Sequence, residues 1–307
     1  MTSSEHRPRI LGVGIACLDY LFLAPRAASG GQAPLRDHLI QGGGLVGTAV
    51  VAAARLGAAA DIWTWVGDDP EGQQVLAELQ QEGVGIGLAE VITGARTALS
   101  FIHVEADTGE RTIYHGPRVQ VPQSLLAGVA KRTLACDVLL VDAVWPEASQ
   151  AAAAMARRDG RPVVGDFCPS AELSELASLV TALIVPGKAA DRLLPDVGRE
   201  EQLRSFARSG PAFVAITSGS EGCHYLEGGR VRHRPAFSVP VVDTTGAGDV
   251  FHGAFAYALA RRWPASQAVE FAAAAAALSC RALGGRTSAP TSDGVLALLK
   301  AQGPGGW

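Results

Sequence analysis

The residues best suited to chemistry lie in Val242–Asp249, a glycine-containing segment between a β-type run, Phe237–Val242, and a helical pattern, Val250–Arg262. A strand, a glycine turn and a helix in this order direct several free backbone N–H groups at one point, and the positive end of the helix dipole adds to their attraction for an anion. Gly246 and Gly248 leave room for a phosphate close to the backbone. The segment therefore predicts a phosphate site.

Asp249 is the acidic residue at the end of this segment, and its position allows two interpretations. A carboxylate in the first turn of a helix stabilises the helix by complementing its dipole. A carboxylate beside a phosphate site is also placed to act as a general base that accepts the proton of an attacking hydroxyl. The spacing alone does not decide between the two.

Two further glycine turns lie next to predicted elements. Gln41–Gly44 contains three consecutive glycines and leads into a helical pattern over Thr48–Leu56. It is either a flexible loop or a hinge whose backbone contacts a substrate. Ile216–Gly222 begins at a strand end, and ligands of open parallel sheets lie outside the carboxyl ends of the strands. This turn is therefore either an ordinary connection or a nucleotide contact.

The elements that must position these turns are apolar strands that alternate with longer helices. Nearly continuous apolar strands are typical of a parallel sheet that helices cover on both faces, so we predict a layered α/β fold. The expected strands are Arg9–Ile15, Asp61–Val66, Val138–Asp142, Pro162–Asp166, Leu183–Pro186 and Phe213–Thr217, and the expected helices are Thr48–Leu56, Gly72–Glu82, Ala148–Arg158 and Glu200–Arg208.

One part of the chain has a period of two instead. Thr97–Glu105 alternates, turns at Asp107-Thr108-Gly109 and continues as Arg111–His115, which predicts a β-hairpin. A hairpin with one solvated or ligand-facing side does not fit inside a doubly wound sheet. We expect it to join the segment Leu18–Leu39 in a small β-sheet lid over one end of the main domain.

Composition excludes several classes of function. The 307 residues carry 26 Lys and Arg against 30 Asp and Glu, so the net charge of −4 provides no general attraction to nucleic acid or an anionic membrane. No apolar run has the length and flanks of a membrane span, and the N-terminus does not read as an export signal. Five scattered cysteines without a C-x-x-C pair predict free thiols, so the expected location is the cytoplasm.

Taken together, the motifs resemble those of the PfkB (ribokinase-like) family of carbohydrate kinases. Asp243–Asp249 matches the C-terminal signature D-T-x-G-A-G-D of that family, and Gly42–Gly57 resembles its N-terminal Gly-Gly signature. Within the family, Gly219–Leu259 looks most like the 6-deoxy-6-sulfofructose kinase branch. The resemblance implies a single Rossmann-like α/β domain over 1–307, with a mainly parallel sheet and a β-sheet lid formed by about 15–40 and 97–116.

The resemblance also assigns roles to individual residues. Asp249 would be the catalytic base, and the amides of Gly246, Ala247 and Gly248 would form the anion hole. The expected sugar-binding residues are Asp19, Gly43, Gly44 and Thr48, and His115 at the end of the hairpin is predicted to face the sugar. The expected nucleotide contacts are Thr217, Gly219, Gly222, Gly246 and Gly248, with the adenine near Ala273, Ala276 and Cys280. Asp243 and Thr245, with carbonyls near Cys280 and Gly285, match a monovalent-cation loop that would bind K⁺.

Two departures from the family pattern bear on metal and substrate. Pro186–Asp191 lacks the N-x-x-E motif that many members use for Mg²⁺, so Asp166 acting through a water, or Asp191, is the alternative. Thr48 stands where ribokinases often have Asn, which argues against ribose.

The prediction is an ATP- and Mg²⁺-dependent kinase of a small sugar, a ketose or a derivative such as sulfofructose, that forms a homodimer through its lid. The alternatives are a ribokinase or nucleoside-kinase specificity, or a non-catalytic sugar or nucleotide sensor of the same fold.

Overall fold

An eight-stranded sheet forms the centre of the computed structural model, which describes residues 7–25, 32–129 and 135–302. Its order is β14-β13-β12-β11-β10-β9-β1-β4; the strands from β12 to β4 are parallel, and β13 and β14 are antiparallel additions at one edge. The strands are β1 (Arg9–Val13), β4 (Ala59–Trp63), β9 (Val138–Asp142), β10 (Val163–Asp166), β11 (Ala182–Pro186), β12 (Phe213–Thr217), β13 (Cys223–Glu227) and β14 (Arg230–Arg234).

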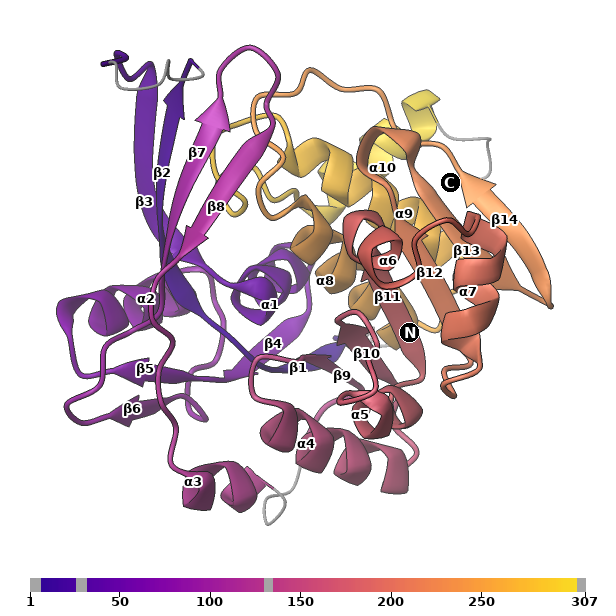
Figure 1. Ribbon diagram of the computed structural model, residues 1–307, viewed down its shortest axis with the longest axis horizontal. Helices are drawn as coiled ribbons and strands as arrows, with labels where there is room; N and C mark the ends of the chain where they lie inside the picture. Colours follow the sequence, from indigo (N-terminus) through magenta and orange to yellow (C-terminus); the bar gives the residue numbers. More distant parts are fainter. Residues whose placement is uncertain (1–6, 26–31, 130–134, 303–307) are drawn as a thin grey trace, which may run out of the picture.

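Helices cover both faces of this sheet (Figure 1). One core contains residues of α1 (Leu45–Arg55), α8 (Ala247–Ala260), α9 (Ala265–Ser279) and α10 (Ser292–Gln302). The other contains residues of α4 (Pro146–Arg158), α5 (Ser174–Leu179), α6 (Gly187–Leu193) and α7 (Arg199–Ala207), with Leu126 of α3 (Gln123–Gly128). Strands such as β9 are therefore buried along their whole length, and the predicted α/β fold with a mainly parallel sheet is confirmed.

Two local predictions need correction. The run 237–242 before the glycine turn is not a strand: β14 ends at Arg234, and the chain runs without regular structure to Gly246. The run contains Pro240, which has no N–H to donate to a neighbouring strand, and no strand of the described sheets pairs with it. The predicted strand Asp61–Val66 is divided into β4 and the short β5 (Trp65–Gly67), which pairs with β6 (Glu90–Ile92).

A separate four-stranded sheet has the order β3-β2-β7-β8 and stands out from one side of the main body (Figure 1). Its strands are β2 (Cys17–Ala24), β3 (Asp37–Gly43), β7 (Leu99–Glu105) and β8 (Arg111–His115). The predicted hairpin is present as β7 and β8, while residues 26–31 of the predicted lid segment lie outside the described residues. Its base packs on α2 (Pro70–Gln81).

The two faces of this sheet have different neighbours because strand residues alternate between faces. The inner face carries Leu21, Ile102 and Val104, which pack with Leu283 of the C-terminal loop. The outer face carries a row of exposed apolar side chains, described below. In the described part of the chain, no helix is both long enough and apolar enough to cross a bilayer.

Candidate active site

The glycine turn forms the start of α8. Gly246 precedes the helix with φ 72°, a left-handed conformation that favours glycine, and α8 begins at Ala247. A Cβ on Gly246 would lie 2.7 Å from Cα of Gly285 and 3.3 Å from Cγ2 of Thr48, so three segments meet at this turn. The first N–H groups of α8 have no partner within the helix, so the turn presents donors of the kind that can bind an anion, and the predicted phosphate site stays a prediction.

Asp249 lies in the first turn of α8 and is partly exposed. Desolvation by the surrounding protein raises the pKa of Asp249 well above its usual range, and the negative charge of Asp166 raises it further, whereas Arg111 opposes the shift. A merely dipole-complementing carboxylate on a helix surface has no such environment. The raised pKa is in keeping with the interpretation of Asp249 as a proton acceptor, which stays a prediction.

Two other carboxylates end neighbouring strands at the same edge of the large sheet. Asp142 ends β9 and Asp166 ends β10, and the two are paired in register. Asp142 is fully buried and accepts the N–H groups of Ile15 (2.7 Å) and Val144 (2.9 Å). Burial, together with the charge of Asp166, raises the pKa of Asp142 to about 7. Asp142 therefore holds the backbone at Ile15, two residues before β2 begins.

His252, one turn after Asp249, joins the helix to the strand ends. Its Nδ1 lies 2.7 Å from the carbonyl of Gly248, and its Nε2 lies 3.1 Å from that of Ile184 and 3.4 Å from Oδ1 of Asp166. The other oxygen of Asp166, Oδ2, is buried and has no hydrogen-bond partner among the described residues. Burial raises the pKa of Asp166, and His252 opposes the rise. The free oxygen is suited to a cation or a cation-bound water.

Asp19 lies on the inner face of the four-stranded sheet and is 7% exposed. Its Oδ1 accepts a hydrogen bond from the thiol of Cys17 (3.2 Å), and Ser100 of β7 is a further partner. Burial raises the pKa of Asp19, and hydrogen bonding and the charges of Arg286 and His115 oppose the shift. His115 pairs with Ser100 across β7 and β8, so the structure brings His115 and Asp19 to one face.

At each of the three consecutive glycines, Gly42 to Gly44, a side chain would collide with a different neighbour. A Cβ on Gly43 would overlap the Asp19 carboxylate, and one on Gly42 would overlap Nη1 of Arg286. Gly44 has φ 88° and caps α1, with its Cβ position 2.5 Å from the carbonyl of Ile15. The structure shows a tightly packed crossing at these glycines instead of a flexible loop, and the predicted substrate contact stays a prediction.

The tip of the hairpin reaches the segment before the glycine turn. Arg111 of β8 donates from Nη1 to Oγ1 of Thr244 (2.8 Å), and that hydroxyl donates to the carbonyl of Gly109 (3.2 Å). The four-stranded sheet therefore contacts the main body at both ends, at the glycine crossing and above the anion site.

The predicted nucleotide residues lie along the same edge. Thr217 ends β12 in register with Pro186 of β11, and the turn η2 (Gly219–Glu221) follows, with Gly222 buried at φ 92°. Ala273 and Ala276 are half-buried on α9. The carbonyl of Cys280 at the end of α9 accepts the N–H groups of Val242 (2.8 Å) and Asp243 (3.3 Å), which ties this helix to the glycine turn.

Asp243 is fully buried beside the turn. Its Oδ1 accepts the N–H (2.8 Å) and the hydroxyl (2.7 Å) of Thr245, and its Oδ2 accepts the N–H of Gly284 (2.8 Å). Among the described residues no arginine or lysine forms an ion pair with it. A buried carboxylate stabilised only by N–H and O–H donors fits a neighbouring monovalent cation. Asp191, by contrast, binds Arg199 (2.5 Å) and Gln202 (3.0 Å) on the surface.

Three residues of this region were not identified from the sequence. Asp142 could have been, because it ends an expected strand at the ligand-binding edge, as Asp166 does. Arg111 and Arg286 carry no sequence signal, since a charged residue in a hairpin or after two glycines is usually solvated.

Comparison with known proteins decides the family. The model of the pfkB family of carbohydrate kinases matches residues 13–292. The chain belongs to this family. Members of the pfkB family and the related ribokinases are ATP-dependent kinases that phosphorylate hydroxyl groups, so this chain is a carbohydrate kinase.

Relatives of this pfkB-family chain align with most of its length. A ribokinase from Haemophilus influenzae is 30% identical over 275 residues, covering 86% of this chain and 89% of its own. A crystal structure from Agrobacterium tumefaciens, provisionally assigned as a ribokinase, has 32% identity and a TM-score of 0.85, covering 96% of this chain and 98% of its own. The Arabidopsis thaliana ribokinase bound to ribose and ATP shares the fold, with a TM-score of 0.77, 23% identity and coverage of 96% and 99%.

Proposed function

We propose that this kinase transfers the γ-phosphoryl group of ATP to a hydroxyl of a ketose or a ketose derivative such as 6-deoxy-6-sulfofructose. The observation that carries the proposal is the position of Asp249, a carboxylate of raised pKa directly beside the glycine turn of α8. The sulfofructose assignment is supported by the sequence of the segment Gly219–Leu259. The ribokinase relatives make ribose the second candidate, and Thr48, where ribokinases often have Asn, argues against it.

In the proposed reaction, the oxygen of the sugar hydroxyl attacks the γ-phosphorus of ATP while Asp249 accepts the proton of that hydroxyl. The bond from the γ-phosphorus to the bridging oxygen breaks, and ADP leaves. The amides of Gly246, Ala247 and Gly248 donate hydrogen bonds to the phosphoryl oxygens, on which charge accumulates. Asp19, Gly43, Gly44, Thr48 and His115 would hold the sugar. Most of the acceleration comes from position and electrostatics, because phosphoryl transfer demands little covalent chemistry from the protein.

The remaining roles follow the same edge of the sheet. The chain would act as one domain, with the four-stranded sheet as a lid that excludes water from the acceptor. Thr217, Gly219 and Gly222 would contact the phosphates and ribose of ATP, and Ala273, Ala276 and Cys280 would line the adenine.

Two cations belong to the proposal. Mg²⁺ would neutralise phosphate charge, and the unpartnered Oδ2 of Asp166 fits a ligand to one of its waters. Asp243, Thr245 and the carbonyl of Gly285 would hold K⁺ beside the glycine turn.

The acceptor is tested by measuring ADP formation with D-fructose, 6-deoxy-6-sulfofructose, D-ribose and adenosine. The proposal expects the highest kcat/KM for one of the two ketoses. A maximum at D-ribose supports the second candidate, a maximum at adenosine indicates a nucleoside kinase, and saturable binding without ADP formation for every compound contradicts the reaction itself.

The base is tested with Asp249→Asn. We expect kcat to fall by about 10²–10⁴, with little change in the Kd of an ATP analogue, because proton transfer is lost and binding is not. In the native enzyme kcat/KM should fall on the acid side at a pH above the ordinary Asp range of about 3.9, since a raised pKa keeps Asp249 protonated there.

Asp293→Asn is the matched control, because Asp293 also lies in the first turn of a helix but on the exposed side of α10. It should keep native kinetics. Equal losses in the two variants would reduce Asp249 to a helix-dipole role.

A further inference from the structure

Arg286 is a buried cation that the mechanism above does not use. It is 4% exposed, and its Nη2 donates to the carbonyl of Gly43 (2.8 Å). Its Nε and Nη1 have no hydrogen-bond partner among the described residues. Burial lowers the pKa of Arg286, and the nearby carboxylate of Asp19 opposes the shift. Burying a guanidinium with two unpaired nitrogens costs free energy. Packing alone therefore does not explain why an arginine occupies this position.

The guanidinium lies in a slot that two glycines leave open. A Cβ on Gly42 would overlap Nη1, and a Cβ on Gly47 would lie 2.6 Å from Nη2. Gly42 is at the end of β3 and Gly47 is in the first turn of α1, so the slot crosses the point where the four-stranded sheet joins the main body. The hydrogen bond to Gly43 therefore restrains the backbone of this junction.

The backbone of Arg286 is fixed from the other side. Arg55 of α1 donates from Nη1 to the carbonyls of Arg286 (2.7 Å) and Ala289 (2.9 Å). The same guanidinium forms a two-point ion pair with Glu82, at 2.7 Å from Nε and 2.6 Å from Nη2. With its main chain anchored, Arg286 holds the carbonyl of Gly43 at a fixed position relative to residues 284 and 285.

Those neighbours pack on the glycine turn of α8. Gly285 lies against Gly246, with the Cα of Gly285 2.7 Å from the Cβ position of Gly246. Gly284 donates its N–H to Asp243, whose other oxygen holds Thr245. A continuous set of contacts thus runs from the junction at Gly43, through Arg286, to the anion site.

We propose that Arg286 is a positioning residue that couples the state of the junction Gly42–Gly47 to nucleotide binding at the glycine turn. The hydrogen bond from Nη2 of Arg286 to the carbonyl of Gly43 is the link between the two places. Nucleotide phosphates on the turn restrain Gly246 and Gly285, and Arg286 carries that restraint to Gly43. The proposal rests on the turn being the phosphate site of the proposed function.

The test is hydrogen–deuterium exchange with and without the non-hydrolysable analogue AMP-PNP and Mg²⁺, so no sugar is required. In the native protein AMP-PNP should slow exchange at the turn 243–249 and also at the junction 42–48, the latter by roughly fivefold or more, the lower range of coupling between sites. In Arg286→Gln the turn should still be protected, whereas the junction should not respond.

Gly42→Ala gives an independent arm, because it displaces the guanidinium while leaving the arginine in the chain. Gly87→Ala is its control, since a Cβ there meets nothing within 4 Å. The Gly42 variant should lose the junction response, and the control should keep it. The coupling is overturned if the junction does not respond in the native protein, or if it keeps the native response in either Arg286→Gln or Gly42→Ala. Absence of protection at the turn in the native protein instead contradicts the proposed function.

Discussion

Asp142 illustrates how much a single residue depends on its surroundings. It is fully buried at the end of β9, where both of its oxygens accept backbone N–H groups, and its pKa is raised to about 7. Above the usual Asp pKa and below 7, the unfolded chain has lost this proton while the folded protein retains it. Raising the pH across that window therefore favours the unfolded state.

We predict that the free energy of unfolding contributed by Asp142 declines between about pH 4 and pH 7, by up to about 1.4 kcal/mol for each pH unit. Asp142→Asn should remove this part of the slope in urea titrations, although it also loses one backbone acceptor. Asp68→Asn is the control, because exposed Asp68 likewise accepts a backbone N–H, that of Gly94. Equal slopes for native protein and Asp142→Asn would refute the assignment.

At the scale of elements, the β7–β8 hairpin places a cation over the glycine turn. Arg111 donates to Thr244, and its charge lowers the pKa of Asp249 against the larger effects of burial and Asp166. The hairpin thus influences the base from a distant part of the chain, because the bonded residues Arg111 and Thr244 are 133 positions apart in the sequence.

Arg111→Met should therefore move the acid limb of kcat/KM to higher pH, by up to about one pH unit, because the carboxylate loses a favourable charge. Arg36→Met is the matched control: Arg36 directly precedes β3 of the same four-stranded sheet and pairs with Asp107 at the exposed hairpin tip (3.0 Å). A pH profile that is the same for both variants would show that Arg111 acts only on the packing of the hairpin.

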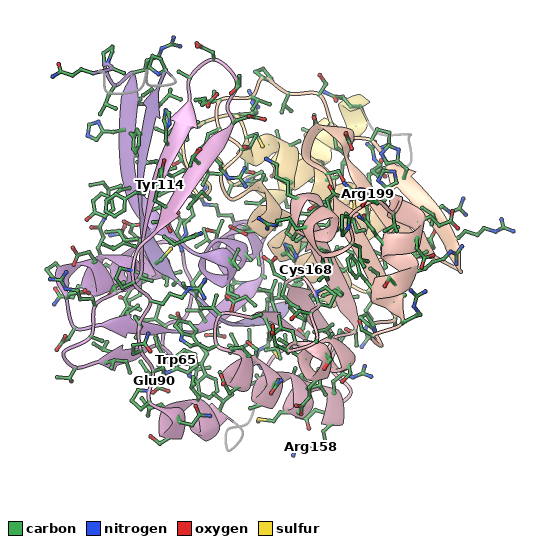
Figure 2. All side chains as sticks on the ribbon, viewed as in Figure 1. Trp65, Glu90, Tyr114, Arg158, Cys168 and Arg199 are labelled. Carbon is green, nitrogen blue, oxygen red and sulfur yellow. The ribbon has the colours of Figure 1, made fainter. Side chains whose placement is uncertain are left out.

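At the scale of the whole molecule, the outer face of the four-stranded sheet presents a row of exposed apolar side chains. Ile40, Tyr20, Phe101 and Tyr114 are cross-strand neighbours in one row over all four strands. Ile40 and Phe101 are each 44% exposed and Tyr114 is 61% exposed. Figure 2 shows Tyr114 on this sheet, well apart from Arg199 and Cys168 of the main body. Such a continuous apolar row favours the proposed homodimer through the lid.

We expect a dimer by sedimentation velocity, and Tyr114→Glu should shift the population to monomers because a charge would be buried at the centre of the contact. Leu193→Glu, a change at an exposed apolar residue of α6, should leave the dimer intact. A native protein that sediments as a monomer at all concentrations would exclude this interface.

Local patterns in the sequence determined the strands, most helices and the glycine turn with Asp249. Apolar periodicity indicates which residues are buried, and a glycine turn followed by a helix indicates a candidate anion site. Both patterns can be recognised because their residues are close together in the sequence. Val138–Asp142 and Phe213–Thr217 were predicted to the residue. The prediction of a strand over 237–242 was wrong because Pro240 in this run lacks the N–H that pairing with a neighbouring strand requires.

Only the tertiary structure decided which charged and hydrogen-bonding partners these distant residues have. Asp19, Asp142, Arg111 and Arg286 come from segments far apart in the chain, and each acquires its shifted pKa or its partners from groups that the fold brings beside it. Charge, desolvation and close approach depend on distance in space, and a one-dimensional pattern contains that distance only where the partners are neighbours in sequence.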